Sequence, residues 1–171
     1  TIGGQLNVLK WLNHNHFIQD FSTQKLIVTK TIHHGHLDIL KWCWENNFIS
    51  ELETYHCSKA ALYGHLDMIY WLRENKCPWD KSMCANAAKG GHFELLCYAR
   101  NHKCPWDYKT CAYAALADRL DILNYAHTNG CPWNYQVIQN AAINGNKSIF
   151  NYAISNGCPY HVSAYDYAAK Q

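Results

Sequence analysis

Small and apolar residues recur in the middle of the chain with the spacing of a helix that buries one face. Within the stretch 81–89, Cys84, Ala87 and Ala88 fall at i, i+3 and i+4. Asp80 precedes the stretch as a suitable N-cap, and a pair of glycines follows it as a helix stop. The pattern therefore predicts a short helix over 81–89, whose small residues allow another helix to approach closely.

A second apolar pattern predicts another helix directly after this one. It begins near His92, has an acidic residue in its first turn, where the helix dipole favours negative charge, and buries Phe93, Leu96 and Ala99. It ends before Cys104-Pro105, because a residue that precedes proline disfavours the helical conformation. Helices of about ten residues are marginal in isolation, so we expect packing on neighbouring helices to stabilise them.

This two-helix pattern is repeated along the chain. Four cysteines, each followed by proline, are spaced 27 residues apart, at Cys77, Cys104, Cys131 and Cys158. A Gly-His-Leu-Asp sequence or a variant of it also recurs, with the spacing stretched to 29 and then 31 residues towards the N-terminus. Such periods indicate arrays in which each unit buries its apolar face against the next. We expect one all-α solenoid domain over residues 1–171, made of about six helix-turn-helix units, incomplete at both ends and part of a longer array.

Two stretches carry a family resemblance. Ala60-Ala61-Leu62-Tyr63-Gly64-His65-Leu66-Asp67 and Ala87-Ala88-Lys89-Gly90-Gly91-His92-Phe93-Glu94 resemble the ankyrin repeat, in which Ala-Ala is followed by Gly-His-Leu-Glu. The period of 27 is shorter than the ~33 residues of ankyrin repeats, so the β-hairpin fingers between units are expected to be reduced or absent. The Gly-Cys-Pro-Trp loops and the Lys-Trp-Leu and Tyr-Trp-Leu sequences look like those of ankyrin-repeat proteins of giant DNA viruses of amoebae.

This resemblance implies an intracellular location, in the cytoplasm of an infected host cell or in the virion. It implies a non-catalytic adaptor whose partner is another protein, of host or viral origin. The alternative is a structural component of a viral particle or of a larger assembly.

Composition and charge narrow the choice of partner. The longest apolar stretches fall short of the ~18 residues that span a bilayer. Fifteen Lys and Arg against thirteen Asp and Glu leave a net charge of +2, and no basic run stands out. We therefore expect no nucleic acid and no membrane as a partner.

The nine cysteines and eleven histidines raise the question of a metal site. Equivalent residues of neighbouring units are expected about 8–10 Å apart, whereas a disulfide needs Cα atoms within about 7 Å and zinc needs four converging ligands. We expect reduced cysteines that fill the core in two separate rows, with no metal and no cofactor. The second row is Cys57, Cys84 and Cys111.

Other repeated positions are expected to have structural roles. His36, His65 and His92 share one position at the start of the second helix. An aromatic position inside that helix is expected to form a stack through successive units, with an exposed ligand strip as the alternative; its members are Trp11, Trp42, Trp71, Tyr98, Tyr125 and Tyr152. The loop tryptophans Trp79, Trp106 and Trp133 are expected to pack as wedges between units.

The candidate functional residues are those that vary from unit to unit. No unrepeated catalytic constellation or phosphate-binding glycine loop is visible, so we expect no enzyme activity. Several variable positions on the predicted first helices carry tyrosine, which offers a large rigid contact area and a polar group. We expect these helices to line a concave side and to bind a protein partner, with free drift of solvent-facing residues as the alternative. The candidates are Lys81, Asn86, Lys89, Tyr108, Tyr113, Leu116, Tyr135, Asn140, Ile143 and Tyr167.

Overall fold

A computed structural model describes residues 2–161, and this part of the chain consists of helices, turns and loops without a strand. The prediction of an all-α chain is confirmed. The helices are α1 (Ile2–His14), α2 (Phe21–His34), α3 (Leu37–Glu45), α4 (Thr54–Tyr63), α5 (Leu66–Glu74), α6 (Lys81–Lys89), α7 (Phe93–Asn101), α8 (Tyr108–Leu116), α9 (Leu120–Thr128), α10 (Gln136–Ile143) and α11 (Lys147–Ser155).

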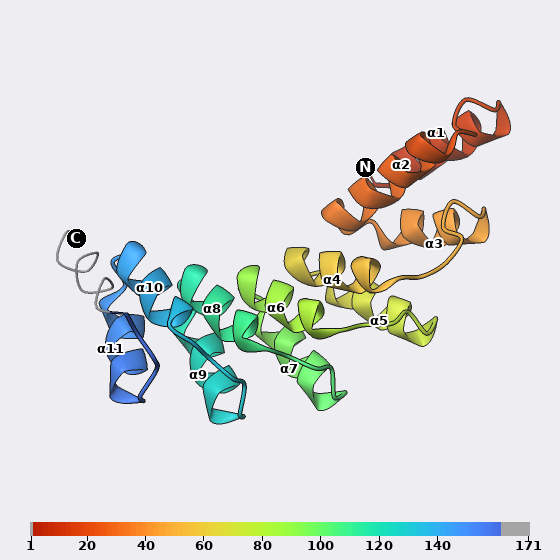
Figure 1. Ribbon diagram of the computed structural model, residues 1–171. Helices are drawn as coiled ribbons and strands as arrows, with labels where there is room; N and C mark the ends of the chain where they lie inside the picture. Colours follow the sequence, from red (N-terminus) through yellow and green to blue (C-terminus); the bar gives the residue numbers. More distant parts are fainter. Residues whose placement is uncertain (1, 162–171) are drawn as a thin grey trace.

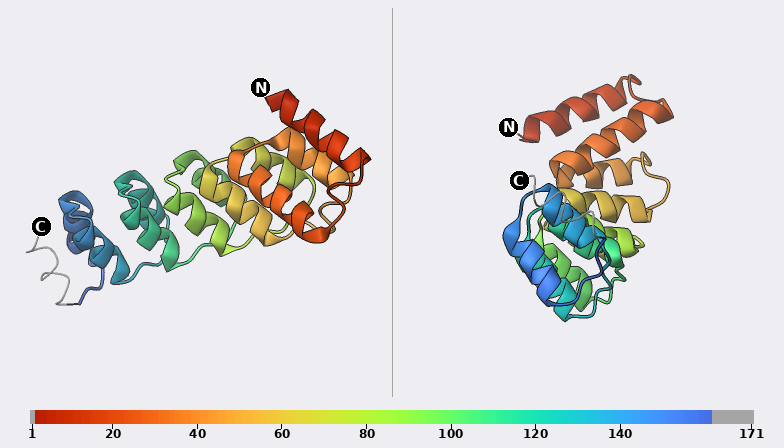
Figure 2. Two further views of the ribbon diagram at one scale, coloured as in Figure 1. Left: turned by 90° about the horizontal axis from the view of Figure 1, so that it is seen from above. Right: turned by 60° about the vertical axis from the view of Figure 1, so that its left-hand side comes forward.

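From α2 onwards the helices form pairs. We refer to α2, α4, α6, α8 and α10 as the first helices, and to α3, α5, α7, α9 and α11 as the second helices. Each first helix contacts its own second helix and the first helix of the neighbouring pair. The pairs lie side by side in an elongated row, and the row curves so that the first helices lie along its inner edge (Figures 1 and 2).

Local sequence sets the helix boundaries. The predicted helix over 81–89 is α6, and the Asp80 carboxylate caps it by accepting a hydrogen bond from the Ser82 backbone N–H at 2.9 Å. The same contact caps α8, where the Asp107 carboxylate accepts from the Lys109 N–H at 3.0 Å. As expected, α7 follows at Phe93 and ends before the Cys-Pro sequence.

Pairs of alanines form the contact between successive first helices. Their side chains are buried in α4, α6, α8 and α10, and the neighbouring first helix lies against them. Because alanine carries only one methyl group, the helix backbones approach closely there. The pairs are Ala60 and Ala61, Ala87 and Ala88, Ala114 and Ala115, and Ala141 and Ala142.

The repeated histidine position links each second helix to the preceding pair. The Nε2 atoms of His65 and His92 lie 3.0 Å and 3.2 Å from the carbonyl oxygens of His33 and Leu62, to which they donate a hydrogen bond. Arg119 occupies the same position one unit later and donates to the Gly91 carbonyl oxygen. These carbonyls belong to the end of the preceding first helix or to the turn after it, where intrahelical donors are missing. The architectural role predicted for His65 and His92 is confirmed.

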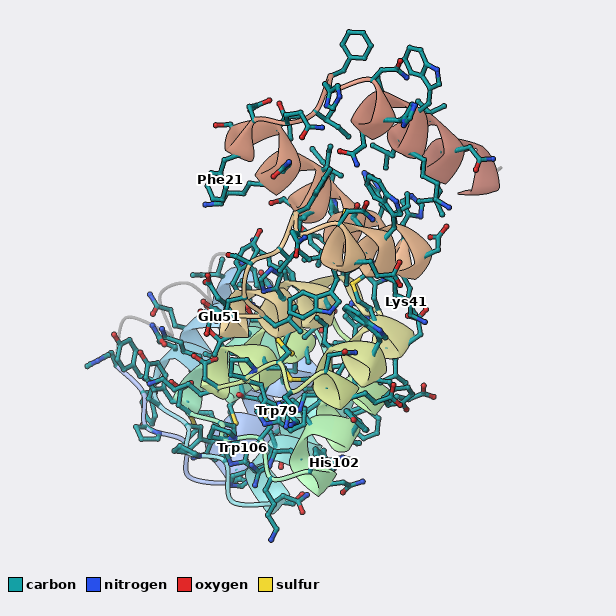
Figure 3. All side chains as sticks on the ribbon, turned by 90° about the vertical axis from the view of Figure 1, so that its right-hand side faces the viewer. Phe21, Lys41, Glu51, Trp79, His102 and Trp106 are labelled. Carbon is teal, nitrogen blue, oxygen red and sulfur yellow. The ribbon has the colours of Figure 1, made fainter. Side chains whose placement is uncertain are left out.

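Each loop tryptophan is held between side chains of two units. The guanidinium groups of Arg73 and Arg100 lie 4.0 Å and 3.9 Å from the ring centroids of Trp79 and Trp106. The ring of His127 stacks on Trp133 in the same way, at 3.7 Å. Tyr98, Tyr125 and Tyr152 present ring edges to these three tryptophans. Figure 3 labels Trp79 and Trp106, which lie on successive loops of the row.

The first aromatic position does not follow the predicted stack. Trp11 is 59% exposed and stacks on Phe17 in the turn that follows its own helix. No loop tryptophan of a preceding unit lies against it within the described residues, so the aromatic contact seen at Tyr98 is missing. α1 also starts at Ile2 and runs through Gly4, which the repeat alignment placed in a turn.

A charge at an alanine of the helix contact should separate the units. We expect Ala88→Glu to lower the free energy of unfolding by about 3 kcal/mol or more, because Ala88 is fully buried and the carboxylate finds no partner there. Lys89→Glu, one residue later on the exposed side of α6, is the control and should cost little. Urea denaturation followed by circular dichroism measures both, and equal stabilities would contradict the packing described here.

Removing one buried hydroxyl should stabilise the chain. Thr110 is fully buried on α8, and its Oγ1 has no hydrogen-bond partner. We expect Thr110→Val, which keeps the shape of the side chain, to raise the free energy of unfolding by about 1 kcal/mol, because the buried hydroxyl is no longer left unsatisfied. Thr110→Ser keeps the hydroxyl and removes the methyl group, so a stabilising effect of the serine variant would argue against this explanation.

Candidate protein-binding surface

Three aligned positions on each first helix form one continuous surface, which we call the first-helix strip. Five and then three residues separate these positions, so they project from one side of each helix. Successive first helices contact one another, which brings the positions together along the row. The strip consists of Lys25, Lys30 and His33 on α2; Thr54, Lys59 and Leu62 on α4; Lys81, Asn86 and Lys89 on α6; Tyr108, Tyr113 and Leu116 on α8; and Tyr135, Asn140 and Ile143 at α10.

The structure places nine of the ten candidate partner-binding residues in this strip. Lys81 and Lys89 are exposed, and so are three large hydrophobic side chains: Leu116 at 43%, Tyr135 at 40% and Ile143 at 47%. The side chains of Asn86, Tyr108, Tyr113 and Asn140 are half-buried. The tenth candidate, Tyr167, lies outside the described residues. Partner binding by the nine stays a prediction, because a surface position alone does not identify a contact.

Two asparagines of the strip also join neighbouring units. The side-chain amide of Asn86 donates to the Ser58 carbonyl oxygen at 3.1 Å, and that of Asn140 donates to the Ala112 carbonyl oxygen at 2.8 Å. Each bond runs from one first helix to the backbone of the preceding one. These two residues therefore have a structural use that their variability in the sequence did not indicate.

The lysines and tyrosines of the strip contact one another across units. The ammonium group of Lys89 lies 5.5 Å from the ring centroid of Tyr113 on the next helix. Lys81 forms an ion pair with Asp107 at 3.2 Å, and its own side chain is mostly exposed. The tyrosine ring is therefore partly fixed before any partner arrives.

Sequence reasoning missed the contribution of α2 to this surface. Lys25, Lys30 and His33 align with the later strip residues only when the spacing of 29 residues between Gly35 and Gly64 is applied to the whole first helix. That spacing was visible in the sequence and provided the signal.

A hollow of about 350 Å³ lies beside the N-terminal end of the strip, and it contains a buried histidine. The walls include Lys25, Glu51 and Tyr55, and His56 is only 8% exposed. The Nδ1 atom of His56 accepts a hydrogen bond from the Glu53 backbone N–H at 2.9 Å, which fixes the start of α4. Burial lowers the pKa of His56, and the backbone carbonyl of Glu53 only partly opposes this effect.

The cysteines supply weak hydrogen bonds as well as core volume. Within residues 2–161 all of them are free thiols, and the described residues contain no cluster suited to a metal ion. The Cys-Pro cysteines donate to the backbone carbonyl that precedes each first helix, as in the 3.3 Å contact of Cys131 Sγ with Asp107 O. The two predicted rows are not separate, because the sulfur atoms of Cys57 and Cys77 lie 3.3 Å apart within one unit. Burial raises the pKa of Cys158 to about 11 and that of Cys43 to about 12, so these thiols stay protonated at neutral pH.

Comparison with known proteins gives no assignment. No family model matches the sequence, and no curated protein is significantly similar to it. No helix in the described part of the chain is long and apolar enough to cross a bilayer. The candidate function therefore depends on the geometry of the strip and on the sequence resemblance.

Acid should weaken the fold through His56. Because the pKa of the folded state lies below the ordinary value of 6.5, the unfolded chain binds the proton more readily. The free energy of unfolding should be highest above pH 6.5 and fall as the pH drops below that value. Urea denaturation at a series of pH values should show this fall, and His56→Gln should reduce it. His14→Gln, at an exposed position, is the control and should leave the fall unchanged; equal pH profiles for wild type and His56→Gln would refute the assignment.

Proposed function

We propose that the chain is a divergent ankyrin-like solenoid of about six short repeats and acts as a non-catalytic scaffold for protein binding. The side-by-side helix pairs, the loops without strands and the Ala-Ala and Gly-His sequences support this proposal. The partner is a host or viral protein, and the site of action is the cytoplasm of an infected cell or the virion, as the resemblance to repeat proteins of giant viruses implies.

One observation carries the proposal: positions that repeat are buried, and positions that vary are exposed on one side. Ala88 is conserved in type from unit to unit and is fully buried. The next residue, Lys89, is exposed and is replaced by Leu116 and Ile143 in the following units. A rigid row that presents changing side chains from fixed backbone positions suits partner binding, because little conformational entropy is lost on association.

A second candidate function is a structural role in a larger assembly. The N-terminal end of the row exposes apolar side chains on α1, on α2 and in the turn between them, and exposed apolar surface of this kind favours association. These side chains are Val8, Trp11, Phe17, Phe21 and Leu26. Sedimentation velocity over a range of concentrations tests this candidate, since an assembly component should self-associate and a monomeric adaptor should not.

A triple substitution in the strip tests the binding scaffold. We expect Tyr108→Ala/Tyr113→Ala/Tyr135→Ala to lose the proteins that the wild type captures from extracts of infected amoebae, because three large contact surfaces are removed together. Affinity purification followed by mass spectrometry gives the comparison. Binding of a captured protein, purified by itself, should weaken by about tenfold or more.

The matched control replaces three exposed side chains of second helices: Lys41→Ala/Tyr70→Ala/Leu120→Ala. This variant should capture the same proteins as the wild type. Thermal denaturation checks that both variants remain folded. Capture that is lost in the control and kept in the tyrosine variant would contradict the proposed surface.

A further inference from the structure

Charge is divided unequally between the two layers of the row. The five first helices contain no Asp or Glu, and their only fully charged side chains are lysines. All second helices except α11 carry acidic residues. The net charge of +2 therefore conceals a cationic inner edge and a mixed outer edge. The first-helix lysines are Lys25, Lys30, Lys59, Lys81, Lys89 and Lys109.

The first-helix strip changes character along its length. On α2, α4 and α6 it contains five lysines and the histidine His33. On α8 and at α10 it contains no charged residue, and three tyrosines, Leu116 and Ile143 take the place of the cations. The strip therefore has a cationic half followed by an aromatic and aliphatic half.

Most of the cations in this half have no carboxylate partner within the protein. The described residues form two ion pairs, and of the strip lysines only Lys81 takes part. Lys25, Lys30, Lys59 and Lys89 have no carboxylate oxygen within 4.0 Å. Burial and then the positive charges of neighbouring side chains, including Lys30 and Lys59, lower the pKa of His33. The positive potential there is available to a ligand.

We propose that the strip binds an extended protein segment that is acidic over one half and hydrophobic over the other. Its carboxylates lie across α2, α4 and α6, where they meet the unpaired lysines. Its apolar side chains lie across α8 and α10, where they contact Leu116, Ile143 and the tyrosine rings. This inference rests on the proposed function and adds the chemistry of the partner to it.

The dimensions of the row set the length of this segment. Packed helices are about 8–10 Å apart, so the four steps from α2 to α10 cover about 32–40 Å. An extended chain advances about 3.3 Å per residue, which gives a segment of about 10–12 residues. A uniform polyanion of the same length fits less well, because its charges over α8 and α10 meet no cation.

Fluorescence anisotropy with defined probes tests the proposal. The probes are a labelled peptide of about twelve residues, with Glu in one half and Leu and Trp in the other, an analogue with Lys in place of Glu, and an oligothymidylate of equal length. We expect the acidic-hydrophobic peptide to bind most tightly and to weaken as salt is raised. The Lys analogue should bind at least about tenfold more weakly. Tighter binding of the Lys analogue or of the oligothymidylate would overturn the proposal, as would absence of peptide binding at about millimolar concentration.

Two variants locate the halves of the segment. Lys30→Glu/Lys59→Glu/Lys89→Glu should weaken the acidic-hydrophobic peptide by about tenfold or more, since repulsion replaces attraction. Leu116→Ser/Ile143→Ser should also weaken it but leave its salt dependence intact. Lys41→Glu/Lys103→Glu, at exposed positions outside the strip, is the charge-matched control and should bind like the wild type. Binding unchanged by the strip variants, or lost equally in the control, would refute the assignment.

The outcome separates this inference from the proposed function. If the captured proteins depend on the three strip tyrosines but bind equally well to the lysine variant, the strip is a protein-binding surface and the acidic-segment proposal is wrong. If neither the tyrosine nor the lysine substitutions affect any captured protein or peptide, both proposals fail. Thermal denaturation of every variant confirms that each is folded.

Discussion

The close approach of successive first helices is the constraint on which the rest of the structure depends. It requires a small side chain wherever two of these helices meet, and the buried alanine pairs meet this requirement in α4, α6, α8 and α10. Since each helix has only eight to fourteen residues from α2 onwards, it gains its stability from this packing more than from its own hydrogen bonds. The elongated row and its inner surface follow from the repetition of one such contact.

The contacts that accompany this packing use the backbone as acceptor. His92 and Arg119 donate to carbonyls at the end of a preceding first helix or in the turn after it, and the Cys131 thiol donates to a carbonyl just before one. Arg100 donates to the Cys104 carbonyl while it covers Trp106. A carbonyl is present at every residue, so these contacts place few demands on the side chains of the neighbouring unit. The exposed positions of the first helices are left free to differ.

Functional specificity in such a row comes from the order of the units as well as from the residues within each one. The same three positions carry lysines at one end and tyrosine, leucine or isoleucine at the other. Because the backbone spacing is regular, a partner that reads this order must have matching chemistry at matching distances. An overall net charge near zero gives no sign of this pattern, since the acidic residues of the second helices offset the lysines.

The sequence by itself determined the local structure: the all-α class, the bounds of α6, the Asp80 cap and the side of each helix that is buried. It also identified most of the variable surface. Only the tertiary structure decided which residues meet across units, including the amide bonds of Asn86 and Asn140, the contact of Cys57 with Cys77 and the exposure of Trp11. The physical reason is that helical periodicity shows which face needs a neighbour, whereas the identity of that neighbour depends on distances between residues more than twenty positions apart in the chain.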